Sequence, residues 1–162
     1  MPDSGFHMSV KGLDSLVVAA EKAGPAWIKM LKEAMVRSTS RIKSDIRENL
    51  TANGTSNTGN LRNSVLVYRA EHDEGIVGVG ERYGGAVEKG RRPGRMPPVE
   101  PIERWARTKL GKSGLGFVIA RKIKNEGTKA QPFVEPAFTG NIGFVQSEFD
   151  KASNELVKML GD

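Results

Sequence analysis

One apolar stripe constrains the fold of this chain more than any other feature of its sequence. Between residues 25 and 50, apolar residues recur at intervals of three, four or seven, with charged residues between them. The stripe consists of Ile28, Leu31, Met35, Ile42, Ile46 and Leu50. This spacing predicts one long amphipathic helix, although the polar Ser38 and Ser40 weaken its middle. Such a helix has to cover a sheet or another helix.

A small sheet is predicted directly after this helix. Residues 51–60 are rich in Asn, Gly, Thr and Ser, which is typical of a surface loop. Residues 64–70 and 75–80 are short β-branched runs separated by four polar residues, a pattern that predicts an antiparallel hairpin. We expect a third strand at residues 83–87.

The C-terminal half predicts three more helices. Apolar residues at helical spacing indicate a helix over residues 98–110 that ends at Gly111, and a second short helix over residues 115–126. The last helix has a stripe of Val145, Phe149, Ala152, Leu156 and Leu160. The fold class is therefore α+β: a small, mainly antiparallel sheet packed by the long helix and the C-terminal helix, with a side lobe of two short helices.

Burial in the side lobe can be predicted from the faces of its first helix. Glu103, Arg104 and Arg107 mark one face as polar. We therefore expect Ile102, Trp105 and Leu110 to be buried between the lobe and the sheet. In the second lobe helix, Phe117, Ala120 and Ile123 or Ile119 are expected to face inward.

The N-terminal residues contribute less to the prediction. Residues 1–12 contain Pro2, Gly5 and Gly12 without periodicity, so we expect a loose leader. Residues 13–20 have apolar positions at helical spacing and predict a short helix before Gly24. We interpret residues 1–162 as a single domain.

The composition excludes several kinds of chemistry. The chain has no cysteine, and its two histidines, His7 and His72, are far apart, so we expect neither disulfides nor a zinc site. No nucleophile with a base and no pair of catalytic carboxylates is evident, so we expect no cofactor and no enzymatic activity. No apolar run is long enough to span a bilayer and no secretory signal is present, which predicts synthesis in a cytoplasm and no membrane partner.

Positive charge is concentrated in one part of the chain. The net charge is +6, and residues 97–130 alone contain eight basic and three acidic residues, whereas residues 131–162 contain two basic and five acidic residues. A basic segment of this kind can bind phosphates or an acidic protein surface, although a charge density of this size more often belongs to a solvated surface without a partner. A basic nucleic-acid-binding module is therefore the alternative function.

A glycine and lysine motif gives a third alternative. Residues 106–113 fit a relaxed phosphate-binding loop, with Gly111 followed by Lys112 and Ser113. The residues before it predict a helix where that loop requires a buried strand. We therefore interpret Gly111 as a helix C-cap, and a nucleotide-dependent enzyme is the least favoured function.

Three segments of the chain carry a resemblance to a known family. They are residues 58–65 (TGNLRNSV), residues 83–90 (YGGAVEKG), and a series made of residues 96–99 (MPPV), 105–111 (WARTKLG), 119–123 (IARKI), 127–128 (GT) and 131–137 (QPFVEPA). Together they resemble the minor structural proteins that complete tails or join heads to tails in long-tailed bacteriophages. The resemblance covers residues 58–138, and its specificity lies in the order and spacing of the segments.

The resemblance implies a structural virion protein of the tail or neck of a phage or prophage. Its working form would be a homo-oligomeric ring, a hexamer, stacked between the tail tube protein and the head-tail connector proteins. Phage DNA in the lumen of such a ring is a further expected contact. Assembly would proceed by interface burial without chemical turnover.

The partner-binding residues are expected at the loop of residues 90–98. Its three prolines and its glycines prevent regular structure, and its arginines repel one another, so we expect a solvated and poorly ordered loop in the free subunit. A planar guanidinium can hold a carboxylate of an adjacent ring through two hydrogen bonds. The predicted partner-binding residues are Glu88, Arg91, Arg92 and Arg95.

Overall fold

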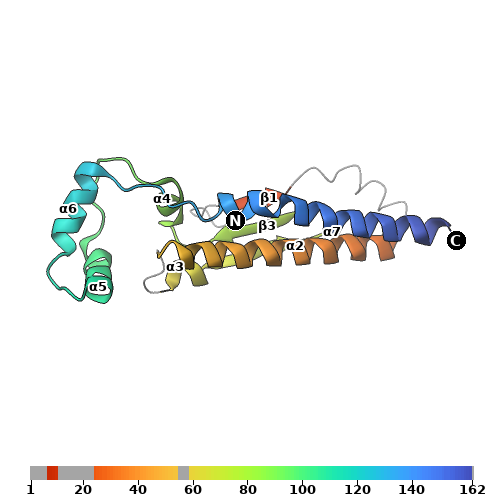
Figure 1. The fold of residues 1–162 in the computed structure, drawn as a ribbon, viewed down its shortest axis with the longest axis horizontal. Coiled ribbons are helices and arrows are strands. Elements are labelled where there is room, and N and C mark those ends of the chain that lie inside the picture. The colour runs from red at the N-terminus through yellow and green to blue at the C-terminus, as the bar shows by residue number, and fades with distance from the viewer. Residues whose placement is uncertain (1–6, 11–23, 55–58, 162) are drawn as a thin grey trace.

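Two long helices lie side by side against a small antiparallel sheet (Figure 1), as the sequence predicts for an α+β fold. The computed structural model describes residues 7–10, 24–54 and 59–161. Helix α2 spans Pro25–Ala52 and helix α7 spans Glu135–Gly161. They run in opposite directions, so the end of α7 lies near the start of α2 (Figure 1). The helix expected over residues 13–20 lies outside the described residues.

Helix α2 follows the predicted stripe. Pro25 occupies its first turn, where the missing N–H would have no helical partner in any case. The polar residues in the middle do not interrupt the helix, because the buried hydroxyls of Ser38 and Thr39 donate hydrogen bonds of 2.8 Å to the carbonyls of Ala34 and Met35. A buried hydroxyl with such a partner is satisfied, so the stripe tolerates it.

The sheet has three strands in the order β1-β3-β2. Strand β2 (Val65–Ala70) and strand β3 (Gly75–Val79) form the predicted antiparallel hairpin, with Val65 opposite Val79. Strand β1 (His7–Val10) pairs antiparallel with the other edge of β3. The prediction of a loose leader is therefore wrong for residues 7–10. Four residues are too few to show a strand periodicity, and it is the unpaired edge of β3 that supplies their hydrogen-bond partners.

The predicted third strand at residues 83–87 is also wrong, because this segment contains the start of a short helix, α4 (Gly84–Lys89). Only Val87 and Tyr83 in this run favour strands. Gly84 packs closely on the end of the hairpin, where an added Cβ would lie 3.1 Å from Cγ1 of Val79. Leu61, on the short helix α3 (Asn60–Asn63), is buried near the same glycine.

The apolar core lies between α2, α7 and the sheet, in two adjoining clusters. The first joins the C-terminal half of α2 to the hairpin and the start of α7, and it contains Ile42, Ile46, Leu50, Leu61, Val65, Val77, Val79, Phe133, Val134 and Ala137. The second joins the other halves of the two helices, and it contains Trp27, Leu31, Ala34, Met35, Phe149 and Ala152. We call this part of the molecule the body.

A lobe of two short helices, α5 (Val99–Leu110) and α6 (Gly116–Glu126), extends beyond one end of the body (Figure 1). Both helices are where the sequence predicts them, and they pack mainly on each other. The carboxylate of Glu103 accepts hydrogen bonds of 2.6 Å from the N–H groups of Gly114 and Gly116, which ties the connecting turn to α5.

The predicted burial of the lobe against the sheet is wrong. Trp105 is 38% exposed and Leu110 is 47% exposed, while Ile102 is half-buried. Phe117 on α6, which was expected to face inward, is 58% exposed. The buried lobe residues are small ones, since Ala106, Gly116 and Ala120 form the contact between the helices. The expectation placed the sheet beside the lobe, whereas the lobe projects away from it. None of the described helices is both long and apolar enough to cross a membrane.

Candidate functional site

Glu88 is a structural residue of the body and is not available for a partner. Its side chain is buried, and its carboxylate oxygens accept hydrogen bonds from the backbone N–H groups of Phe133 (2.7 Å), Val134 (2.9 Å) and Glu135 (3.0 Å). The first N–H groups of a helix have no partner within it, and a negative charge there also interacts favourably with the helix dipole. Glu88 therefore caps α7 from a distance in sequence, and its assignment to the partner-binding set is corrected.

The loop of residues 90–98 joins the body to the lobe. It is exposed at Arg92 and Arg95, as expected. It is also attached by its backbone: Arg91 and Thr128 exchange two N–H···O bonds of 3.0 and 2.8 Å, and the Gly94 N–H donates to the Lys124 carbonyl at 2.8 Å. The predicted loop without fixed contacts is therefore wrong for these positions.

Two glycines permit the close approach of the segments that enter and leave the lobe. Gly90 and Gly127 have φ values of 73° and 76°, which disfavour other residues. A Cβ on Gly127 would collide with the Arg91 carbonyl, and one on Gly90 would lie 2.6 Å from the Thr128 carbonyl oxygen. We call this crossing of the two segments the clasp.

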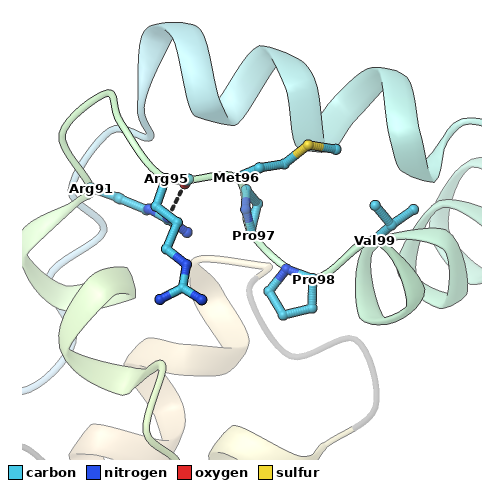
Figure 2. A pocket seen from close by; sticks show the side chains of 6 residues that line it. All are labelled: Arg91, Arg95, Met96, Pro97, Pro98 and Val99. Carbon is cyan, nitrogen blue, oxygen red and sulfur yellow. Dashed lines mark hydrogen bonds between the residues drawn. The ribbon is translucent and has the colours of Figure 1, made fainter.

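The three arginines of the loop have different surroundings. The guanidinium of Arg91 donates to the carbonyl of Arg95 (Figure 2), so Arg91 is half-buried and bonded within the loop. Arg92 and Arg95 form no ion pair with any described residue. Of the predicted set, Arg92 and Arg95 are the two whose charges are free to meet a partner.

An open hollow of about 470 Å³ lies beside this loop. Its lining comes from one short segment of the chain and consists of Arg91 and the residues from Arg95 to Val99 (Figure 2). The lining has two guanidinium groups and otherwise apolar or proline side chains, with no carboxylate, hydroxyl or imidazole. It can hold an anionic or apolar side chain, but it offers no nucleophile and no base.

The lobe and its loop are strongly basic. Residues 90–130 contain eleven basic and three acidic residues, so their net charge of +8 exceeds the +6 of the whole chain. The three acidic residues each lie beside one arginine or lysine of their own helix. Apart from Arg91, whose guanidinium donates to the Arg95 carbonyl, seven basic residues of this segment form no ion pair within the described chain: Arg92, Arg95, Lys109, Lys112, Arg121, Lys124 and Lys129. This surface favours an anionic partner.

Apolar side chains are exposed on the same lobe, and sequence reasoning missed them as surface residues. Besides Trp105, Leu110 and Phe117, Val118 is 61% exposed. The sequence of α6 indicates that some of its apolar side chains are exposed, because four consecutive apolar residues from 117 to 120 cannot all face one side of a helix. Exposed apolar groups surrounded by charge are characteristic of protein interfaces.

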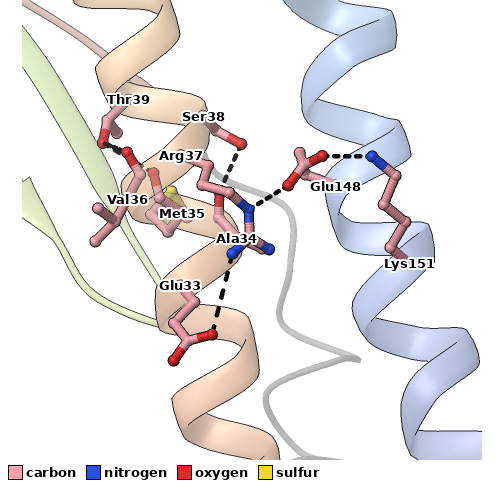
Figure 3. A network of polar contacts seen from close by, with 9 residues as sticks. All are labelled: Glu33, Ala34, Met35, Val36, Arg37, Ser38, Thr39, Glu148 and Lys151. Atoms are coloured by element: carbon pink, nitrogen blue, oxygen red, sulfur yellow. Dashed lines mark hydrogen bonds and ion pairs between the residues drawn. The ribbon is translucent and has the colours of Figure 1, made fainter.

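The body contains one cluster of ionised groups that has a structural role. Arg37 on α2 reaches the buried carboxylate of Glu148 on α7, and Lys151 donates to the same carboxylate at 2.7 Å (Figure 3). The hydrogen bonds from Lys151 and Arg37 hold the pKa of Glu148 below its ordinary value. The cluster joins the two long helices, so it serves their packing.

The phosphate-loop motif of residues 106–113 has the structure of a helix end. Its residues up to Leu110 belong to α5, and Gly111 adopts the left-handed conformation of a C-cap with a φ of 65°. Lys112 is exposed. No described strand leads into this motif, so the geometry that a nucleotide-binding loop needs is not formed here.

Comparisons of the chain with protein family models, with curated proteins and with solved structures found no match.

Proposed function

We propose that this chain is a structural subunit of a phage tail or neck, which assembles as a ring at the junction of tail tube and connector. The proposal rests on the resemblance of residues 58–138 to the tail-completion and head-tail joining proteins. The observation that supports it best is the basic lobe with its exposed apolar side chains, projecting from a body that has its own core. A lobe of this kind gains burial by meeting another protein.

In this proposal, the loop beside the hollow meets carboxylates of the adjacent ring. Arg92 and Arg95 are exposed and form no ion pair within the described chain, so their charge is available. Arginine suits the role because its planar guanidinium can hold a carboxylate through two hydrogen bonds. Arg91 supports the contact indirectly by bonding to the Arg95 carbonyl.

The experiment that tests this role is charge reversal in the loop. The variant Arg92→Glu with Arg95→Glu is expected to keep the melting temperature of the wild type, since neither side chain is buried, and to abolish infectious particles through like-charge repulsion. The matched control is Lys109→Glu with Lys112→Glu, which reverses the same number of charges elsewhere on the lobe. Full phage yield from the folded loop variant would remove the loop from assembly.

Nucleic-acid binding is the second candidate function, favoured by the seven lobe cations without ion pairs. Binding through phosphates predicts an affinity for duplex DNA that falls steeply with salt and depends little on sequence. The exposed apolar residues of the lobe argue for a protein partner instead, because nucleic-acid interfaces are more polar than protein interfaces. Tight, salt-dependent DNA binding by the isolated chain would reverse this preference.

A further inference from the structure

The outer face of α7 is a second surface without a partner in the described chain, and its chemistry is opposite to that of the lobe. Ile142 is 62% exposed and Val157 is 69% exposed, and the exposed Asp150 lies between them. Separations of eight and seven residues place the three side chains along one stripe of the helix. Glu135 begins the same stripe, and no basic residue belongs to it.

Glycines on the exposed side of α7 point to a close neighbour. Gly140 and Gly143 lie inside the helix, where glycine costs about 1 kcal/mol relative to alanine. A Cβ on either would meet nothing within 4 Å, so the packing of the free subunit does not require them. A helix from another molecule could approach the α7 backbone closely at this point.

Helix α6 presents the complementary stripe. Phe117, Arg121 and Lys124 follow one another at intervals of four and three residues, so they share a face of the helix, and all three are exposed. Neither Arg121 nor Lys124 forms an ion pair within the described residues. Val118, 61% exposed, widens the apolar part of this surface.

We infer that the α6 stripe of one copy packs on the outer face of α7 in a second copy. Phe117 and Val118 cover Ile142, while Arg121 and Lys124 lie along Gln146 and face Asp150, because the two stripes have nearly the same spacing along their helices. Apolar contact at the centre with paired charges at the rim is the ordinary composition of a protein interface. The inference rests on the proposed function and deepens it, because it names the contact that closes the ring.

The contact has to join two copies. The lobe lies beyond the end of the body at which α7 begins, and Ile142 and Asp150 lie further along that helix, away from the lobe (Figure 1). A lobe therefore cannot cover the α7 stripe of its own chain. Because the two surfaces differ, the contact is heterologous, and repetition of such a contact generates a ring when the rotation closes.

A charge exchange between the two surfaces tests the inference. The lobe variant is Arg121→Glu with Lys124→Glu, and the helix variant is Gln146→Lys with Asp150→Lys, all at exposed positions. Each variant alone is expected to be monomeric by light scattering where the wild type associates. Their equimolar mixture is expected to associate again, because reversed lobes then meet reversed helices and unchanged lobes meet unchanged helices.

Folding and net charge are controlled separately. Circular dichroism melting of each variant shows whether it is folded, and Lys109→Glu with Lys112→Glu gives the lobe variant's change of charge without touching the α6 stripe. This control is expected to associate like the wild type, and its failure to do so would overturn the inference in favour of a general charge effect.

Three further outcomes would overturn the inference. They are association of either stripe variant at the wild-type level, a mixture of folded variants that stays monomeric, and a wild type that is monomeric at every concentration. If the lobe variant and the helix variant each still form rings, the inferred contact is wrong but the proposed function is unaffected. The infectivity of the loop variant tests that function independently.

Discussion

The body and the lobe differ in where they keep their large side chains. In the body, Trp27, Phe133 and Leu31 are almost completely buried, whereas in the lobe Trp105 and Phe117 are substantially exposed and the helix contact is made by small residues. Burial of apolar area is the main favourable term in folding. The body therefore holds most of the stability of the chain, and the lobe retains apolar surface that can be buried in an interface.

Substitution of the two tryptophans should give the largest difference in unfolding free energy between the body and the lobe. Trp27→Ala is expected to lower the free energy of unfolding by about 3 to 5 kcal/mol, since it empties a filled site. Trp105→Ala is expected to lower it by no more than about 1 kcal/mol, because its side chain keeps much of its solvent contact. Urea unfolding measures both. Equal losses would show that the lobe is part of the core.

Trp27→Phe is a useful control for this pair. Among the described residues, the Nε1 group of Trp27 is buried without a hydrogen-bond partner. Phenylalanine keeps most of the apolar volume and removes that unsatisfied donor, so we expect a smaller loss than with alanine.

Removal of the distant cap on α7 is the second largest expected effect. Glu88→Ala leaves three backbone N–H groups without their acceptor, two of them at buried residues, and should cost about 2 to 4 kcal/mol. Glu100→Ala changes an exposed carboxylate in the first turn of α5 and should leave the melting temperature almost unchanged. Similar effects of the two substitutions would contradict the capping role.

Low pH should weaken the packing of α2 on α7 at the Glu148 cluster. The pKa of Glu148 is lowered in the folded state by the hydrogen bonds of Lys151 and Arg37, so its ionised form stabilises the fold above the ordinary pKa of 4.5. That contribution is lost as the pH falls through the lower folded-state pKa. The difference in unfolding free energy between wild type and Glu148→Gln should therefore be largest near pH 7 and shrink as the pH falls below 4.5. At pH 7, Glu126→Gln should cost less stability than Glu148→Gln, because it removes an ion pair between two exposed side chains.

The smallest expected effect is an increase in the stability of the free subunit. Gly143→Ala should stabilise the free subunit by about 0.5 to 1 kcal/mol, because alanine favours the helix and its Cβ meets nothing within 4 Å. Gly75→Ala is the opposing control, since its Cβ would collide with Met35 and lie 2.7 Å from Thr39 Cγ2. A loss of stability with Gly143→Ala would mean that α7 is already covered in the free subunit.

The elements with strong periodicity could be predicted from the sequence. The α2 stripe, the hairpin of β2 and β3, and the helices α5 and α6 all depend on local spacing, turn residues and caps, and all are confirmed. The strand predicted at residues 83–87 is wrong because the glycines in this segment have little preference for any secondary structure. Strand β1 failed because its pairing depends on the edge of β3, about seventy residues away.

The candidate site was only partly predictable for the same reason. The loop arginines could be found because their charge and the surrounding prolines are local properties. The role of Glu88 could not, since its three donors lie 45 to 47 residues further along the chain. The exposure of Trp105 was also hidden, because an amphipathic pattern indicates which face is apolar and leaves open what covers that face.

The clasp has a consequence for how the molecule can change. The chain leaves the body and returns to it at Arg91 and Thr128, which are bonded to each other. The segment between these two residues, which contains the lobe, is therefore a long insertion in the body whose two ends are held together by hydrogen bonds. The entropy of closing an insertion grows only with the logarithm of its length, about 0.6 kcal/mol for each doubling. A related chain could therefore have a longer or shorter segment between these two residues at a small cost in the stability of the body. The partner-binding surface of the lobe could change in this way while the body keeps its fold.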